Sequence, residues 1–118
     1  MVASYVPERG DLIKVNFDPS AGHEQAGWRP ALVLSPTSYN GKTHLVIVVP
    51  VTNQRKGYPF EIVLPANLKT TGVILADQIK CLDWKQRSAR LVESVPRSVL
   101  EETQEKLGLL LGMKVQGG

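Results

Sequence analysis

The chain has 118 residues, 42% of them hydrophobic and 21% charged, which favours one folded domain and excludes intrinsic disorder. Its single cysteine excludes an internal disulfide and a cysteine-based zinc cluster. The formal net charge of +3 favours a polyanion or an acidic protein as the binding partner.

No apolar run approaches the roughly 18 residues that a membrane span requires, and the N-terminus lacks the basic-then-apolar pattern of a signal peptide. We therefore expect a soluble, cytoplasmic protein. Its single domain is expected to cover residues 1–118, with a core over about 5–112 and a frayed tail over 113–118.

Two strands are predicted near the N-terminus, on either side of a long loop. Apolar and polar residues alternate over 12–17, which is typical of a half-buried strand. The uninterrupted apolar run 31–34 predicts a strand buried on both faces. The loop 18–30 is longer than a hairpin turn of roughly two to five residues and carries several functional groups, so it is a candidate site.

The middle of the chain alternates strands with polar connections. Residues 36–42 are expected to form a turn or a short helical piece, with Asn40-Gly41 as a hairpin signal. The β-branched run 44–51 is the strongest predicted strand. A polar loop over 52–59 follows, and residues 60–64 predict a further short strand.

Residues 72–84 are predicted to be extended, with a bend or bulge near Asp77-Gln78. Cys81 lies in this apolar stretch and is predicted to be an inert core thiol. A last short strand is expected over 89–93.

The C-terminal segment has the signals of a helix. Ser94 and Pro96 favour a helix start, and Gly112 favours its end. Apolar residues between them recur at helical spacing. We expect four leucines of this helix to be buried, so that it covers the sheet.

These elements together predict a mainly β protein with some α-helix. The expected architecture is a strongly curved antiparallel sheet or small barrel, with the C-terminal helix packed on it. The strands and helices do not alternate as a parallel sheet would require.

Arg29 is the first candidate for chemistry. It precedes Pro30, which favours an extended backbone at the mouth of a strand. Its planar guanidinium can bind two phosphate oxygens at once. The alternative is a salt bridge to Glu24 or Asp18 that only fixes the loop.

The polar loop 52–59 offers further groups. Thr52 can donate its hydroxyl to a phosphate oxygen, or it can simply cap the turn. Arg55 and Lys56 lie near Tyr58, a combination that suits single-stranded nucleic acid, with cations for the backbone and a ring for a base.

Two further candidates lie in the first loop, and metal chemistry has little support. Trp28 offers another stacking ring, although loop aromatics are often simply packed. His23 has an unperturbed pKa suited to proton transfer near neutral pH. His23 and His44 are too far apart for a zinc-ligand motif, and the chain has no glycine-rich phosphate loop.

The sequence resembles the MazF/PemK family of endoribonuclease toxins, and it is more similar to the MazF branch than to the Kid/PemK branch. The resemblance covers about residues 5–112. Its motifs are Gly10-Asp11-Leu12-Ile13, Phe17-Asp18-Pro19, the run from Glu24 to Pro36, Val49-Pro50-Val51-Thr52, the run from Lys56 to Glu61, and the run from Gly72 to Gln78.

The resemblance implies an SH3-like, CcdB-like barrel that forms a homodimer and binds RNA in a groove across both subunits. It implies cleavage of single-stranded RNA at a short sequence, without metal or cofactor, leaving a 2′,3′-cyclic phosphate and a 5′-hydroxyl. It also implies a MazE-like antitoxin whose acidic, disordered segment occupies that groove.

By position, Arg29, Thr52 and Glu24 match residues with catalytic roles in MazF-like enzymes, and His23 is a possible addition. The other residues expected to bind RNA are Asp18, Gln25, Trp28, Asn53, Gln54, Arg55, Lys56, Tyr58, Asp77, Gln78 and Lys80. One position departs from the Kid/PemK branch, because Leu75 stands where that branch has a catalytic arginine.

We therefore expect Arg29 and Thr52 to stabilise the phosphorane, since charge-assisted donors aimed at developing charge give the largest electrostatic gain. Glu24 or His23 would move protons or position the arginine. Two other functions remain open at this point: a CcdB-like poison that binds DNA gyrase, and a barrel that only binds RNA.

Overall fold

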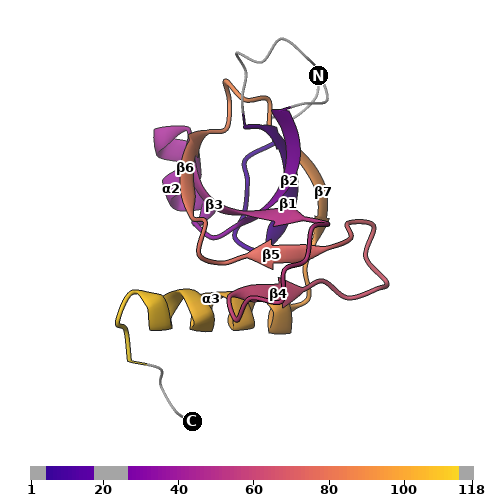
Figure 1. The fold of residues 1–118 in the computed structure, drawn as a ribbon. Coiled ribbons are helices and arrows are strands. Elements are labelled where there is room, and N and C mark those ends of the chain that lie inside the picture. The colour runs from indigo at the N-terminus through magenta and orange to yellow at the C-terminus, as the bar shows by residue number, and fades with distance from the viewer. Residues whose placement is uncertain (1–4, 18–26, 115–118) are drawn as a thin grey trace.

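The computed structural model describes residues 5–17 and 27–114, and in these ranges it shows a curved antiparallel sheet followed by a C-terminal helix (Figure 1). The elements in chain order are β1 (Asp11–Asn16), β2 (Trp28–Val33), α2 (Thr37–Thr43), β3 (Leu45–Thr52), β4 (Glu61–Val63), β5 (Val73–Leu75), β6 (Lys80–Asp83), β7 (Arg90–Ser94) and α3 (Arg97–Leu110).

The strand order is β4-β5-β3-β2-β1-β7, and β6 also pairs with β3. Each of the recorded pairings is antiparallel. The sheet curls on itself, while α3 lies beneath β4 and β5 (Figure 1). Because β4 and β7 end the order without pairing to each other, the sheet is strongly curved but open. The predicted fold class is confirmed.

The two faces of the sheet carry separate apolar cores, because successive side chains of a strand point to opposite faces. Neighbours such as Leu12 and Ile13 therefore belong to different clusters. Leu12, Leu32, Val49, Val51, Ile62, Ile74 and Val99 form part of one core, and Ile13, Val15, Ala31, Val33, Val46, Val48, Leu82 and Trp84 form the other.

The strand β2 begins earlier than the sequence indicates. Ala31 to Val33 are fully buried, which confirms the predicted burial on both faces. However, Arg29 and Pro30 lie within the strand and pair with Val15 and Lys14 of β1, instead of ending a loop. The pairing with β1 extends the strand past the apolar run.

The short helical piece expected over 36–42 is confirmed as α2, but the hairpin signal at Asn40-Gly41 is wrong, because both residues lie inside this helix. Asn40 is fully buried and its side chain is fully used. Its amide donates to the carbonyls of Pro7 (2.8 Å) and Ser35 (2.9 Å), and its Oδ1 accepts from the Ser35 hydroxyl (2.6 Å). The left-handed residue that ends the helix is His44.

The bend expected near Asp77-Gln78 is confirmed as a large bulge between β5 and β6. Ile74 pairs with Val51 and Lys80 pairs with Val48, so six residue steps on one side oppose three on β3. The extra residues push Asp77 and Gln78 out into solvent.

The core position predicted for Cys81 is wrong, because its thiol is exposed. Leu82 and Trp84 take the inward positions of this segment. Period-two alternation therefore turns Cys81 to the outer face.

The helix α3 follows Pro96 as expected, but the prediction that its leucines are buried is wrong. Its buried residues are Val99 and Thr103. Leu109, Leu110 and Leu111 are 58%, 43% and 65% exposed, because the C-terminal half of the helix extends beyond β4 (Figure 1). Neither helix in the described ranges is long and apolar enough to cross a membrane.

Candidate active site

A pocket of about 230 Å³ lies where the ends of β2 and β3 meet the loop 53–59 and the bulge between β5 and β6. It gathers residues from four separate parts of the chain. Its lining residues are Arg29, Pro50, Val51, Thr52, Gln54, Lys56, Tyr58, Glu61, Leu75, Asp77 and Gln78.

The strand register brings Arg29 and Thr52 together. Ala31 of β2 pairs with Pro50 of β3, the last pair of this ladder toward the pocket. Arg29 and Thr52 each lie two residues beyond that pair, so the ends of the two strands carry both residues to the same pocket. Two residues 23 positions apart in sequence thus line one pocket.

Arg29 is exposed at the pocket. Among the described residues, none forms a recorded hydrogen bond or ion pair with its guanidinium. The salt bridges considered from the sequence involve Glu24 and Asp18, which lie outside the described residues. With respect to the residues that the structure describes, Arg29 therefore presents a free bidentate donor to the pocket.

The Thr52 hydroxyl has two compatible roles. Its Oγ1 accepts the backbone N–H of Gln54 at 3.1 Å, which is the turn-capping role. This bond uses an oxygen lone pair, so the hydroxyl hydrogen stays available to donate to a ligand. The cap also fixes where that donor lies.

Glu61 shapes the loop 53–59, and the sequence reasoning missed it. Its carboxylate is buried at 9% exposure. One oxygen accepts the N–H of Lys56 at 2.9 Å, and the other accepts the N–H of Gly57 at 3.0 Å. No sequence signal marks this role, because Glu61 occupies the polar position of an alternating strand.

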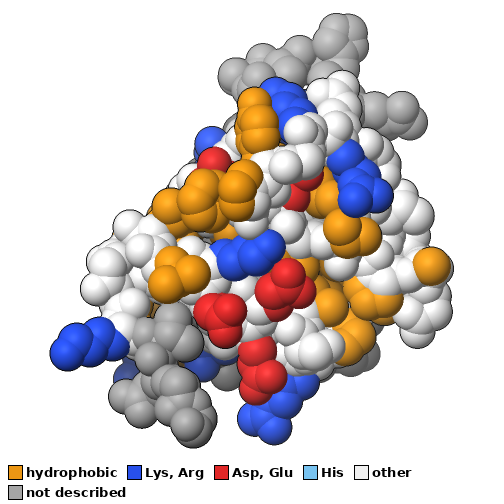
Figure 2. All heavy atoms as spheres, turned by 60° about the horizontal axis from the view of Figure 1, so that its bottom comes forward, with side chains coloured by type: hydrophobic (Ala, Val, Ile, Leu, Met, Phe, Trp, Pro, Cys, Tyr) orange, Lys and Arg blue, Asp and Glu red, His pale blue; other side chains and the backbone are white. Residues whose placement is uncertain are grey.

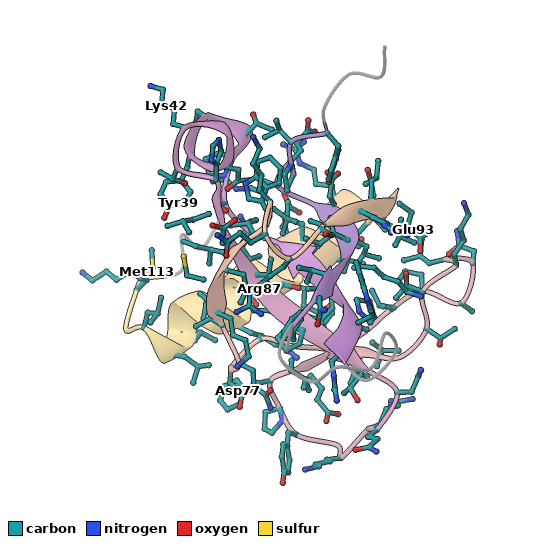
Figure 3. The ribbon with its side chains drawn as sticks, turned by 90° about the horizontal axis from the view of Figure 1, so that it is seen from above. Tyr39, Lys42, Asp77, Arg87, Glu93 and Met113 are labelled. Atoms are coloured by element: carbon teal, nitrogen blue, oxygen red, sulfur yellow. The ribbon has the colours of Figure 1, made fainter. Side chains whose placement is uncertain are left out.

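The loop carries a cation and a ring side by side. The Lys56 ammonium lies 5.9 Å from the centroid of the Tyr58 ring, and Tyr58 is 56% exposed. Both residues line the pocket, as does Gln54. Asp77 and Gln78 complete it from the bulge, and Asp77 lies at the opposite end of the molecule from Lys42 (Figure 3).

Four other candidates lie near the pocket but do not line it. Arg55 and Lys80 are exposed. Asn53 accepts a 2.9 Å hydrogen bond from the Thr71 hydroxyl. Trp28 is half-buried, and the Arg90 guanidinium stacks on its ring at 5.2 Å from the centroid, a contact the sequence did not suggest.

The remaining predicted residues, Asp18, His23, Glu24 and Gln25, lie outside the described residues. Within the described ranges, no group of three or more His, Cys, Asp and Glu side chains could hold a metal ion. The carboxylate of Glu61 is already used by two backbone donors. Besides the exposed carboxylate of Asp77, the pocket therefore presents a bidentate cation, an ammonium and a hydroxyl, and these three donors suit a phosphate oxygen.

The fold and this pocket define a small antiparallel β protein with a polar pocket at one end of its curved sheet. The sequence model of a protein family, the PemK-like, MazF-like toxins of type II toxin–antitoxin systems, matches residues 8–111. The chain belongs to this family.

Identity to curated relatives is higher for a MazF than for a PemK protein. The chain is 50% identical to the endoribonuclease toxin MazF of Escherichia coli K12, over 95% of this chain and 100% of that protein. It is 39% identical to the Escherichia coli endoribonuclease PemK, over 88% of this chain and 81% of that protein.

Solved structures show the same architecture. The structure of MazF from Deinococcus radiodurans (Form-I) has a TM-score of 0.85 at 55% identity and covers 93% of this chain and 100% of its own. A MazE–MazF structure from the same organism (Form-III) has a TM-score of 0.86 at 53% identity, with the same coverage.

Proposed function

We propose that this protein is a sequence-specific, ribosome-independent endoribonuclease toxin that cleaves single-stranded RNA without a metal ion. One observation carries the proposal: the chain is 50% identical to an endoribonuclease MazF over that protein's whole length, and its pocket is lined by Arg29, which has no partner among the described residues, and by Thr52. We propose a cytoplasmic location, because messenger RNA, the substrate of such a toxin, is found there.

The proposed reaction is an internal transesterification. The 2′-oxygen loses its proton and attacks the neighbouring phosphorus, a P–O bond forms, and the bond to the 5′-oxygen breaks. The departing oxygen takes up a proton. The products are a 2′,3′-cyclic phosphate and a 5′-hydroxyl, and the charge to be stabilised is that of the crowded phosphorane between them.

Arg29 and Thr52 suit the phosphorane. The guanidinium supplies two charge-assisted donors, and the capped hydroxyl supplies a third from the facing strand. Arginine is a poor proton carrier because its guanidinium stays charged at physiological pH. Glu24 and His23 are therefore the groups that we propose to move protons or to position Arg29.

The proposed partners are a MazE-like antitoxin and a second copy of this chain. Related MazF proteins form MazE–MazF complexes. The exposed apolar end of α3 supports a homodimer, because Leu109, Leu110, Leu111 and Met113 are each more than 40% exposed. Figure 2 shows hydrophobic side chains gathered on the face that carries α3, next to acidic ones.

The test is cleavage of a long, unstructured RNA by purified protein in excess EDTA, with every new 5′ end mapped. We expect cuts at one short motif, with 5′-hydroxyl ends, and a loss of about 10²–10³ in rate for Arg29→Ala, the size that removal of one anion-stabilising donor causes. The cleavage rates of the His23→Ala and Glu24→Ala variants are then measured across pH 5 to 9.

Intact RNA would contradict the enzyme proposal, and undiminished RNA binding by Arg29→Ala without turnover would favour a binding module. Inhibition of gyrase would favour a CcdB-like poison. If His23→Ala and Glu24→Ala both kept the full rate at every pH, the proposed proton roles would be wrong.

A further inference from the structure

A second groove lies beside the active site, on the outer side of β1 and β7. Its volume is about 370 Å³, and the connection 65–72 forms one wall. We call it the flanking groove; it is lined by Lys14, Pro30, Asn53, Lys69, Thr70, Thr71 and Val92. Its charged lining residues are two lysines, both exposed.

A third cation, Arg90, lies next to this groove and faces another positive charge. Arg90 of β7 pairs directly with Lys14 of β1. Like charges directly opposite each other across two strands repel, so this pairing destabilises the sheet. Within the described ranges, the two ion pairs are Arg97–Glu101 and Lys106–Glu102, and neither neutralises Lys14, Lys69 or Arg90.

The carboxylate of Glu93 lies at the wall of this groove, and its hydrogen bonds hold that wall in place. It accepts the N–H groups of Lys69 at 3.1 Å and Thr70 at 2.8 Å. Desolvation alone would raise the pKa of Glu93, but these donors and the Lys69 charge outweigh it and hold the pKa below its ordinary value. Figure 3 labels this residue.

The flanking groove meets the active site through the backbone. Pro30 and Asn53 line the groove, and they directly follow Arg29 and Thr52, which line the pocket. Gly72 of the groove wall also lies very close to Thr52, because a Cβ added to Gly72 would lie 2.2 Å from the Thr52 carbonyl oxygen. Successive residues face opposite sides of a strand, so the two hollows lie on either side of one strand end.

We propose that the flanking groove binds the phosphodiester backbone of RNA nucleotides next to the cleaved one. This inference rests on the proposed function, because it takes single-stranded RNA as the substrate. An RNA strand leaving the pocket around the end of β2 and β3 meets Lys14 and Lys69, with Arg90 beyond. These cations neutralise phosphates without reading bases, so the groove contributes affinity and not sequence choice.

The test compares two RNAs that share one mapped cleavage motif. The short RNA contains little more than the motif, and the extended RNA adds about ten nucleotides on each side, enough to reach the groove. For the double variant Lys14→Ala/Lys69→Ala we expect KM for the extended RNA to rise about fivefold or more with kcat unchanged. Both constants for the short RNA should stay as in the wild type.

The salt dependence gives an independent readout. For single strands, each phosphate contact contributes about −0.7 to the slope of log affinity against log salt. Two lost contacts should therefore make the slope for the extended RNA shallower by about 1.4. The charge-matched control is Lys42→Ala/Lys85→Ala, which removes the same charge outside both hollows and should leave this slope unchanged.

Three outcomes would decide against one proposal or the other. Equal loss on both RNAs, or the same loss in the control, would overturn the flanking groove. If the wild type cleaved no RNA in the mapping experiment, the proposed function would be overturned instead. The groove would then still be tested by direct binding of a short and an extended single-stranded RNA, where equal affinities would exclude it.

Discussion

At the scale of single residues, the site depends on a buried carboxylate that is not itself aimed at the substrate. Glu61 places both oxygens on backbone donors of the loop 53–59. That loop presents Gln54, Lys56 and Tyr58 to the pocket. Glu61 is thus a positioning residue, and its effect on activity passes through the loop.

We expect Glu61→Gln to lower kcat/KM for RNA cleavage about tenfold or more. Glutamine can accept only one of the two N–H donors, and its amide turns a donor toward the other. An unsatisfied buried donor costs about 1–3 kcal/mol, and 1.4 kcal/mol is a factor of ten. Cleavage kinetics and amide exchange of Lys56 and Gly57 measure the change together.

Glu105→Gln is the matched control, because it makes the same substitution at an exposed position of α3. It should leave both readouts at the wild-type level. Faster exchange at Lys56 and Gly57 in Glu61→Gln, combined with full activity, would show that the loop does not need this anchor for cleavage.

At the scale of elements, α3 covers the sheet with one half and leaves the other half apolar and exposed. Val99 and Thr103 are buried in the N-terminal half. Around the C-terminal half, a groove of about 600 Å³ includes Leu34, Tyr39, Ile47, Ile79, Leu107, Leu111 and Met113. A surface of this kind is typical of a protein–protein interface.

We expect Leu111→Glu to weaken the homodimer at least tenfold, because it places a charge in an interface that excludes water. Sedimentation velocity over a range of protein concentrations measures this. Val63→Glu is the control, since Val63 is also an exposed apolar residue, 54% accessible, but lies on β4. A dimer unaffected by Leu111→Glu would place the interface elsewhere.

At the scale of the whole molecule, charge is unevenly divided along the chain. The last 18 residues carry two lysines and three glutamates, a net charge of −1. Since the whole chain has a net charge of +3, the first 100 residues have a net charge of +4. The basic part contains the pocket and the flanking groove. It would attract RNA and the acidic segment of an antitoxin alike, and the two would compete.

We expect inhibition by an acidic antitoxin peptide to weaken more than tenfold as salt rises from about 0.05 to about 0.5 M, because screening shortens the reach of surface charges. The measurement is the inhibition constant in the RNA-cleavage assay at each salt concentration. A peptide with its carboxylates replaced by amides should bind weakly and show little salt dependence. Inhibition that does not vary with salt would indicate an apolar docking site instead.

The sequence predicted the elements wherever local pattern and tertiary packing agree. The alternation over 12–17 predicted β1 (Asp11–Asn16), and the β-branched run 44–51 predicted β3 (Leu45–Thr52). The bulge at Asp77-Gln78 was also predictable, because the side-chain pattern changes face there. Long motifs shared with the MazF family indicated Arg29 and Thr52 before any geometry was known.

The failures occurred where a distant partner overrides the local signal. Asn40-Gly41 reads as a turn, yet Pro7 and Ser35 bind the Asn40 side chain and keep it in a helix. The spacing of the α3 leucines indicates an apolar face, but spacing does not say how far the sheet extends beneath it. Cys81 faces outward because Leu82 takes the inward position.

By itself, the sequence determined the family and the curved antiparallel architecture and indicated Arg29 and Thr52 as candidate site residues, because periodicity and motif spacing are properties of the chain. Only the tertiary structure showed that Glu61 anchors the loop and that Lys14 and Lys69 line a second groove. Those facts depend on which strands pair and where their ends meet. Residues far apart in the chain can form hydrogen bonds or bring their charges together only once the sheet has curled.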